Sequence, residues 1–168
     1  MASSTPTEVY LIRHGIAAER GTYADDTQRP LTQRGRVKTV AIAQRLKQWG
    51  LRFDRMLTSP LVRARQTAEI LQAAGLANRA ERFEPLVPGG QLQTWLDWLA
   101  VQPDDLRSLA LVGHEPDLSS WGERLVNGET NERWVLKKAG IIGLQLPVGE
   151  SAIANSQLFW LAPPRFVL

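Results

Sequence analysis

Apolar runs of strand length alternate with amphipathic segments of helical period along most of this chain. Strands are predicted at residues 8–12, 53–58, 80–84, 106–112, 140–146 and 157–161. Helices are predicted over residues 32–50 and 59–75, and around the apolar stripes that include Leu92 and Leu118. Strand then helix, repeated four times, is typical of an α/β three-layer sandwich, in which a mainly parallel sheet has helices on both faces.

The overall composition is that of a globular protein with an ordinary core. A length of 168 residues suits a single domain covering residues 1–168, with residues 1–6 as a loose tail. There is no cysteine, which excludes disulfides, thiolate catalysis and zinc–thiolate sites. The first residues lack the basic start and apolar stretch of a signal peptide, and no segment has the apolar length of a membrane span. We therefore expect a cytoplasmic protein with no membrane contact.

Positive charge in this chain is carried mostly by arginine. Sixteen of the 20 basic residues are arginines, and the formal net charge is +3. The planar fork of arginine donors fits phosphate and carboxylate oxygens in pairs. The arginines are scattered, without a basic run or interleaved aromatic residues, so nucleic-acid binding is not favoured.

Polar residues follow three of the predicted strands directly. Arg13 and His14 follow the first strand, residues 59–63 follow the second, and Gly113 and His114 follow the run "LALV". Ligands of parallel α/β sheets bind at the carboxyl ends of the strands. Both histidines of the chain are therefore expected at one edge of the sheet.

Local signals predict how individual helices begin and which side chains they bury. Thr32 is a predicted helix cap, and the sequence Ser59-Pro60 predicts a second helix start with Ser59 as the cap. Trp49 falls on the predicted inner face of the first helix. Arg65 lies two residues after Arg63, so it is expected to point elsewhere.

Two charged pairs near the predicted strand ends have ordinary structural interpretations. Lys137 and Lys138 could add positive charge near the site or form a solvated strand end, and the second interpretation is favoured. Glu115 and Asp117 are expected to favour the start of the next helix, because acidic groups stabilise a helix N-terminus.

Two histidines, several arginines and no thiol at one sheet edge favour the handling of a phosphoryl group. One imidazole can attack phosphorus and carry the phosphoryl group covalently. Arginines can then stabilise the equatorial oxygens in the transition state, and the second imidazole can add a donor. A metal site on His14 and His114 is not supported, since no carboxylate cluster accompanies them and Arg13 would repel a cation.

At these residues the chain resembles the histidine phosphatase superfamily, whose fold is phosphoglycerate mutase-like. The segments "LIRHG", "SPLVRARQTA" and "LVGHEP" carry the resemblance, and "RPLTQRG" makes the chain similar to SixA-type protein phosphohistidine phosphatases. The resemblance implies that His14 is the nucleophile and that His114 is the second catalytic histidine, which also contacts phosphate. It further implies that Arg13, Arg29 and Arg63 bind phosphate.

One expected element of the family lacks a clear counterpart. Members that act on phosphate esters usually have a glutamate that protonates the leaving alcohol, and Glu84 in "ERFEPLVPGG" is the nearest candidate general acid. The chain is also too short for a large lid. An imidazole, with a pKa of about 6.5, leaves far more readily than an alkoxide, so a site without an acid suits a phosphoramidate.

These observations predict a metal-independent phosphatase without cofactor. The predicted substrate is phosphohistidine on a partner protein, such as a phosphorelay or carrier protein, and phosphate or sulfate is expected to bind in the site. Two alternatives stay open: a phosphatase for small esters or anhydrides, and a non-catalytic phospho-binding module. Hydrolysis of an activated phosphoryl donor would separate an enzyme from a binding module.

Overall fold

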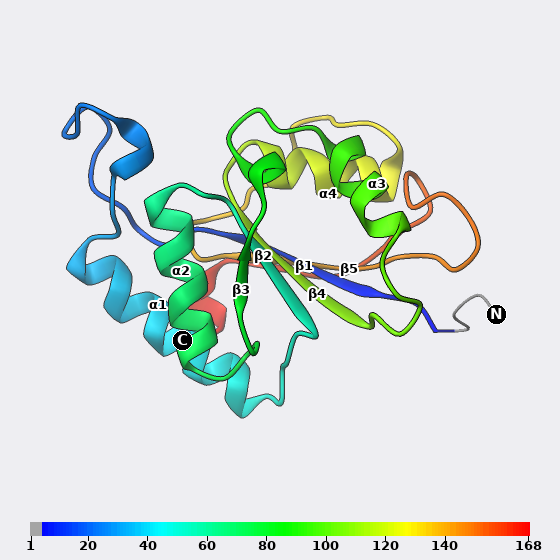
Figure 1. Cartoon of the computed structure of the whole chain (residues 1–168), viewed down its shortest axis with the longest axis horizontal. Helices are drawn as coiled ribbons and strands as arrows, with labels where there is room; N and C mark the ends of the chain where they lie inside the picture. Colours follow the sequence, from blue (N-terminus) through cyan, green and yellow to red (C-terminus); the bar gives the residue numbers. More distant parts are fainter. Residues whose placement is uncertain (1–4) are drawn as a thin grey trace.

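The centre of the computed structural model, which describes residues 5–168, is a six-stranded sheet in the order β3-β2-β4-β1-β5-β6 (Figure 1). The strands are β1 (Glu8–Arg13), β2 (Arg55–Thr58), β3 (Ala80–Arg82), β4 (Ser108–Gly113), β5 (Ile141–Gln145) and β6 (Gln157–Ala162). The pairs among β1 to β4 are parallel, whereas β5 runs antiparallel to β1 and β6 antiparallel to β5. No helix separates β5 from β6, so the two strands form a hairpin.

Four helices cover this sheet, with α1 and α2 on one face and α3 and α4 on the other (Figure 1). Their bounds are α1 (Gln33–Gln48), α2 (Val62–Ala73), α3 (Leu92–Ala100) and α4 (Asp117–Asn127). Successive strand side chains point to opposite faces. Ile12 of β1 accordingly packs in one apolar cluster with Ile42 of α1, and Leu11 packs in another with Trp95 of α3. The predicted three-layer sandwich is confirmed.

The register of the parallel strands aligns the segments that follow them. Arg13 of β1 is paired with Gly113 of β4, and Thr58 of β2 with Val112 of β4. Beyond the strands, the His14 amide donates to the Gly113 carbonyl at 3.0 Å. The carboxyl ends of β1, β2 and β4 therefore meet at one edge of the sheet, as the sequence predicts.

The first helix begins as predicted, but its last aromatic residue is not buried. Thr32 Oγ1 accepts a hydrogen bond from the Gly35 amide at 2.9 Å, which caps α1. Gly50, with a φ of 81°, follows the helix in the left-handed region that glycine adopts most readily. The prediction that Trp49 lies on the inner face is wrong: it follows the last helical residue, and 53% of it is exposed.

The second helix begins later than the sequence suggests. Leu61 is the residue at its N-cap position and makes no side-chain capping bond. The prediction that Ser59 is the N-cap residue is wrong, because Leu61 takes that position; Ser59 Oγ accepts from the Leu61 amide at 3.3 Å and lies 2.8 Å from His114 Nε2. The predicted strand 80–84 ends at Arg82, and Glu84 opens a short 3-10 helix, η2 (Glu84–Leu86).

Residues at the N-terminal end are attached to the start of β4. The predicted loose tail covers residues 1–6, of which 1–4 lie outside the described residues. Thr7 Oγ1 donates to the Leu106 carbonyl at 2.9 Å. Among residues 5–168, no helix has both the length and the apolar character needed to cross a membrane. The assignment of residues 1–168 to a single domain stays a prediction.

Candidate active site

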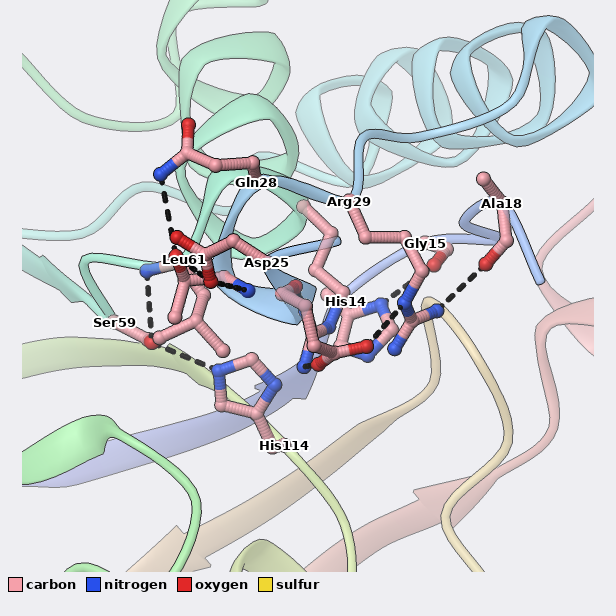
Figure 2. A network of polar contacts seen from close by, with 12 residues as sticks. His14, Gly15, Ala18, Asp25, Gln28, Arg29, Ser59, Leu61 and His114 are labelled. Atoms are coloured by element: carbon pink, nitrogen blue, oxygen red, sulfur yellow. Dashed lines mark hydrogen bonds and ion pairs between the residues drawn. The ribbon is translucent and has the colours of Figure 1, made fainter. Parts of the chain in front are cut away.

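His14 is held as a neutral imidazole of defined tautomer directly after β1. Its side chain is buried, and Nδ1 lies 2.7 Å from the carbonyl oxygen of Gly15 (Figure 2). A carbonyl oxygen can only accept, so Nδ1 carries the proton of this hydrogen bond. Nε2 is then the ring nitrogen with the lone pair, which is the form that a nucleophilic histidine needs.

The glycine after His14 is required by the close packing of α1. The Gly15 amide donates to Thr67 Oγ1 of α2 at 3.0 Å. A Cβ at Gly15 would lie 2.5 Å from Thr39 Oγ1 of α1, which is closer than real Cβ contacts. Glycine therefore allows α1 to approach the loop that carries His14, and its carbonyl fixes the imidazole.

The surroundings of His14 also keep it uncharged. Burial lowers the pKa of His14 to about 2, and the neighbouring charges of His114, Arg63 and Arg13 act in the same direction. The Gly15 carbonyl opposes this shift but does not overcome it. At physiological pH the imidazole is neutral, with its Nε2 lone pair available.

His114, directly after β4, lies against His14. The ring centroids of the two histidines are 5.3 Å apart (Figure 2). A hydrogen bond of 2.8 Å links His114 Nε2 to Ser59 Oγ. Burial lowers the pKa of His114 to about 3, helped by Arg63 and Arg29 and opposed by Asp26. The prediction that the two histidines lie together is confirmed.

Arg29 and Arg63 approach the histidines from a loop and from α2. The guanidinium of Arg63 is buried and donates through Nη1 to the Asp26 carbonyl at 2.9 Å. Arg29 is also buried and donates through Nη1 to the Ala18 carbonyl at 2.7 Å (Figure 2). Burial and the charge of Arg29 lower the pKa of Arg63. Loop residue Arg29, whose position the sequence could not fix, therefore lies beside Arg63.

Arg13 is held by the segment that precedes β5. Its Nη1 donates to the Leu136 carbonyl at 2.8 Å. The Ala139 amide donates to the carbonyls of both Arg13 and His14, each at 3.1 Å. Glu115 Oε1 accepts from the Leu136 amide at 3.2 Å, and Glu115 Oε2 accepts from a backbone amide of α4. Glu115 thus does more than favour the helix start.

Three buried nitrogens of this site have no hydrogen-bond partner within residues 5–168. Six buried side-chain atoms have no hydrogen-bond partner within residues 5–168, and three of them are Arg13 Nε, Arg63 Nε and His114 Nδ1. An unpaired buried polar group costs about 1–3 kcal/mol, and native proteins retain few of them. All three residues lie near enough to His14 to shift its pKa. The arrangement suits an anion with several oxygen atoms.

Three residues of this site were missed or misread from the sequence. Asp26 bonds to two of the arginines, and Ser59 bonds to His114. The interpretation of Lys138 as a solvated strand end is wrong, because it is half-buried and Arg13, Arg29 and Arg63 contribute, after burial, to lowering its pKa. Lys137 is exposed, as expected. The position of Ser59 at a strand end was the one signal available.

Glu84 is exposed at the start of η2, beyond the edge strand β3. No hydrogen bond or ion pair among residues 5–168 joins its side chain to His14 or His114. Its role as a general acid stays a prediction. Within the same residues, no group of three or more histidine or acidic side chains could hold a metal ion.

Replacement of Arg13, Arg29 or Arg63 by lysine is expected to lower kcat/KM for a phosphoryl substrate by about ten- to a hundredfold each. Lysine keeps the charge but loses the paired donors, and a charge-assisted hydrogen bond contributes about 1.5–3 kcal/mol. Steady-state kinetics on an aryl phosphate would measure the loss.

Arg65→Lys is the matched control. Arg65 lies on α2, is half-buried and has an unpaired Nε of its own, but no side-chain hydrogen bond within residues 5–168 joins it to His14, His114 or the other arginines. Its kcat/KM should stay within about twofold of the wild type. Equal losses in Arg65→Lys and Arg63→Lys would contradict the assignment of Arg63 to the phosphoryl group.

Comparison with known proteins gives consistent matches. A sequence profile described as "Histidine phosphatase superfamily (branch 1)" matches residues 9–82. An uncharacterized protein of Picosynechococcus sp. is 48% identical over 96% of this chain and 99% of its own length. Phosphohistidine phosphatase SixA of Escherichia coli K12 is 32% identical over 73% of this chain and 76% of its own length. A structure of the protein histidine phosphatase SixA complexed with tungstate superposes with a TM-score of 0.83 and 27% identity, over 96% of this chain and 100% of that one.

Proposed function

This chain belongs to the histidine phosphatase superfamily, and from that membership we propose that it removes the phosphoryl group from phosphohistidine on a partner protein. The observation that carries the proposal is the neutral His14, whose Nε2 has a free lone pair. Close to it lie residues with three unpaired buried nitrogens, namely Arg13 Nε, Arg63 Nε and His114 Nδ1. A nucleophile and oxyanion donors are the two components that phosphoryl transfer through a covalent intermediate needs.

In the first step, His14 Nε2 forms a bond to phosphorus while the bond from phosphorus to the substrate nitrogen breaks. The other ring nitrogen of the substrate carries a proton, so the electron pair of the broken bond leaves with a neutral imidazole. His14 gains positive charge as the new bond forms, and the Gly15 carbonyl stabilises it through the Nδ1 proton at 2.7 Å. Arg13, Arg63 and His114 bind the phosphoryl oxygens, on which negative charge accumulates.

In the second step, a water oxygen forms a bond to phosphorus and the bond to His14 Nε2 breaks. Inorganic phosphate leaves, and the imidazole returns to its neutral tautomer. Independence of metal ions and a cytoplasmic location belong to the same proposal.

The leaving group favours phosphohistidine over an alkyl ester. Glu84 is exposed and forms no hydrogen bond or ion pair with either histidine, so residues 5–168 offer no carboxylic acid bonded to them. An alkoxide needs such an acid, whereas an imidazole, with a pKa of about 6.5, leaves readily. The name of the Escherichia coli relative, a phosphohistidine phosphatase, also supports this substrate.

Charge beyond the three arginines favours a substrate that carries more than one anionic group. Lys138 is half-buried and Arg20 is exposed, and neither forms an ion pair within residues 5–168. Both lie close to Arg13: the charge of Arg20 lowers the pKa of Arg13, and the charge of Arg13 lowers the pKa of Lys138. Acidic side chains beside a phosphohistidine on a protein surface would be attracted by these two cations.

A panel of phosphorylated compounds tests this function. We expect kcat/KM to be highest for a phosphohistidine protein, lower for free phosphohistidine, and lowest for alkyl phosphates. Lys138→Met should lower kcat/KM for the phosphohistidine protein on the order of tenfold more than kcat/KM for free phosphohistidine. The reason is that it removes a positive charge that only the larger substrate needs. Release of inorganic phosphate would be the measurement in every case.

Lys137→Met is the matched control, since Lys137 is the exposed neighbour of Lys138. It should leave both rates unchanged. Faster hydrolysis of pyrophosphate or of a small ester than of any phosphoprotein would favour the small-molecule alternative. Tight phosphate binding without hydrolysis of any donor would favour a binding module.

A further inference from the structure

Asp26 connects the two arginines that the sequence assigns to phosphate. Its Oδ1 accepts from Arg29 Nε at 2.8 Å, and its Oδ2 lies 3.2 Å from Arg63 Nη2. Its backbone carbonyl accepts from Arg63 Nη1 at 2.9 Å. The side chains of Arg29 and Arg63 are only 5% and 3% exposed, whereas that of Asp26 is 50% exposed. One carboxylate at the mouth of the site thus holds two buried cations.

The contacts of Asp26 leave another edge of each guanidinium available. Arg63 uses Nη1 and Nη2 toward Asp26, while its Nε is buried and has no partner within residues 5–168. Arg29 uses Nε toward Asp26 and Nη1 toward the Ala18 carbonyl, which leaves Nη2. Asp26 therefore binds nitrogens other than the unpaired Arg63 Nε, and does not occupy it.

The charge of Asp26 offsets repulsion between the two arginines. The charge of Arg29 lowers the pKa of Arg63, while Asp26 raises it. Asp26 acts on His114 in the same way, since its charge opposes the lowering of the His114 pKa. The Arg29 hydrogen bond lowers the pKa of Asp26 itself, so the carboxylate is ionised at physiological pH. Without this charge, Arg29 and Arg63 would repel each other across the site.

The local shape of the loop depends on the preceding residue rather than on the Asp26 side chain. Asp25 Oδ1 accepts from the Thr27 amide at 2.9 Å and from Thr27 Oγ1 at 2.7 Å. These bonds cap the short 3-10 helix η1 (Asp26–Gln28), and the Gln28 side chain donates to Thr27 Oγ1 (Figure 2). Asp25 shapes the turn, and the Asp26 carboxylate is directed at the arginines.

We propose that Asp26 is a positioning residue, whose carboxylate orients the guanidinium groups of Arg29 and Arg63 so that their remaining donors bind the phosphoryl oxygens. This role rests on the proposed function in one respect, namely that the two arginines bind a phosphoryl group. Asp26 acts through the arginines and forms no bond to the substrate.

The test compares Asp26→Asn with the neighbouring control Asp25→Asn. Asparagine keeps an oxygen acceptor but removes the charge, so Asp26→Asn is expected to weaken the binding of inorganic phosphate by about tenfold and to lower kcat/KM for an aryl phosphate by about ten- to a hundredfold. Asp25→Asn should change both by less than about threefold. Calorimetric titration with phosphate, steady-state kinetics and thermal unfolding would be measured for each variant.

A double variant shows whether Asp26 acts through Arg63. If it does, Asp26→Asn combined with Arg63→Lys should lose clearly less activity than the product of the two single losses, because only the effect of Asp26 on Arg29 remains to be lost. A loss equal to the product of the two single losses would overturn the proposal. So would equal losses in Asp25→Asn and Asp26→Asn, which would indicate a purely structural effect on the loop.

Measuring the binding of inorganic phosphate by the wild-type protein and by Asp26→Asn distinguishes failure of this inference from failure of the proposed function. Tighter phosphate binding by Asp26→Asn would overturn the positioning role, because the carboxylate would then be a competing anion. Unchanged binding and kinetics in a folded Asp26→Asn variant would overturn it as well. Absence of both phosphate binding and hydrolysis in the wild-type protein would instead overturn the proposed function, and the positioning role with it.

Discussion

Brief incubation with a radiolabelled phosphoryl donor, followed by denaturation, is expected to trap acid-labile, base-stable phosphate on His14. His14→Ala should abolish the labelling and lower turnover by at least about a thousandfold, since no other group would attack phosphorus. The reason lies in the Nδ1 hydrogen bond to Gly15, which leaves Nε2 as the nucleophilic nitrogen, and in the low pKa that keeps the ring neutral. Mapping of the labelled peptide would identify the residue.

His114→Ala is the appropriate comparison for this experiment. His114 is expected to stabilise the phosphoryl oxygens through Nδ1, so its loss should slow labelling without moving the label. Thermal unfolding would verify that both variants are folded. Label on His114 in the wild-type protein, or turnover that survives in His14→Ala, would contradict the mechanism.

A steep dependence of kcat/KM on the pKa of the leaving group is the second large effect that we expect. Aryl phosphates and phosphohistidine should be hydrolysed, and simple alkyl phosphates at least about a hundredfold more slowly. The physical reason is that each 1.36 kcal/mol of unassisted barrier is about tenfold in rate, and no carboxylic acid among residues 5–168 is hydrogen-bonded to either histidine. A series of aryl and alkyl phosphates, compared under conditions in which chemistry limits the rate, would measure the slope.

Glu84→Gln tests the remaining candidate acid in the same series. Because Glu84 is exposed at the start of η2, the substitution should leave hydrolysis of phosphohistidine almost unchanged. A shallow slope in the wild type that becomes steep in Glu84→Gln would have the opposite meaning. Glu84 would then be a working general acid that reaches the site when substrate binds, and a small-molecule ester would become the better substrate.

The core of the site could be located from the sequence because it follows strand ends. His14 follows β1 and His114 follows β4, and these two strands are parallel neighbours in register. Their carboxyl ends must therefore lie side by side, independently of the conformation of the loops that follow. Arg63 lies in the first turn of α2, just beyond the end of β2, so it too was placed by local pattern.

Residues whose role depends on long-range contacts could not be assigned in this way. The signals around Ser59 predict a helix cap, yet its hydroxyl bonds to His114, 55 positions away. Lys138 has the pattern of a solvated strand end, and the hydrogen bonds that its neighbours Leu136 and Ala139 make with Arg13 and His14 bring it to the site. Local propensity cannot show such contacts, because it reports neighbours along the chain and not across it.

What the sequence by itself determined is the alternation of strands and helices, the edge of the sheet at which the histidines lie, and the segments that carry the family resemblance. Tertiary structure alone decided the protonation state of His14, the bridging of Arg29 and Arg63 by Asp26, and the burial that leaves three nitrogens without partners. The physical reason is that hydrophobic periodicity depends on residues close together in the sequence. Desolvation and the proximity of charges, by contrast, arise only when distant segments pack together.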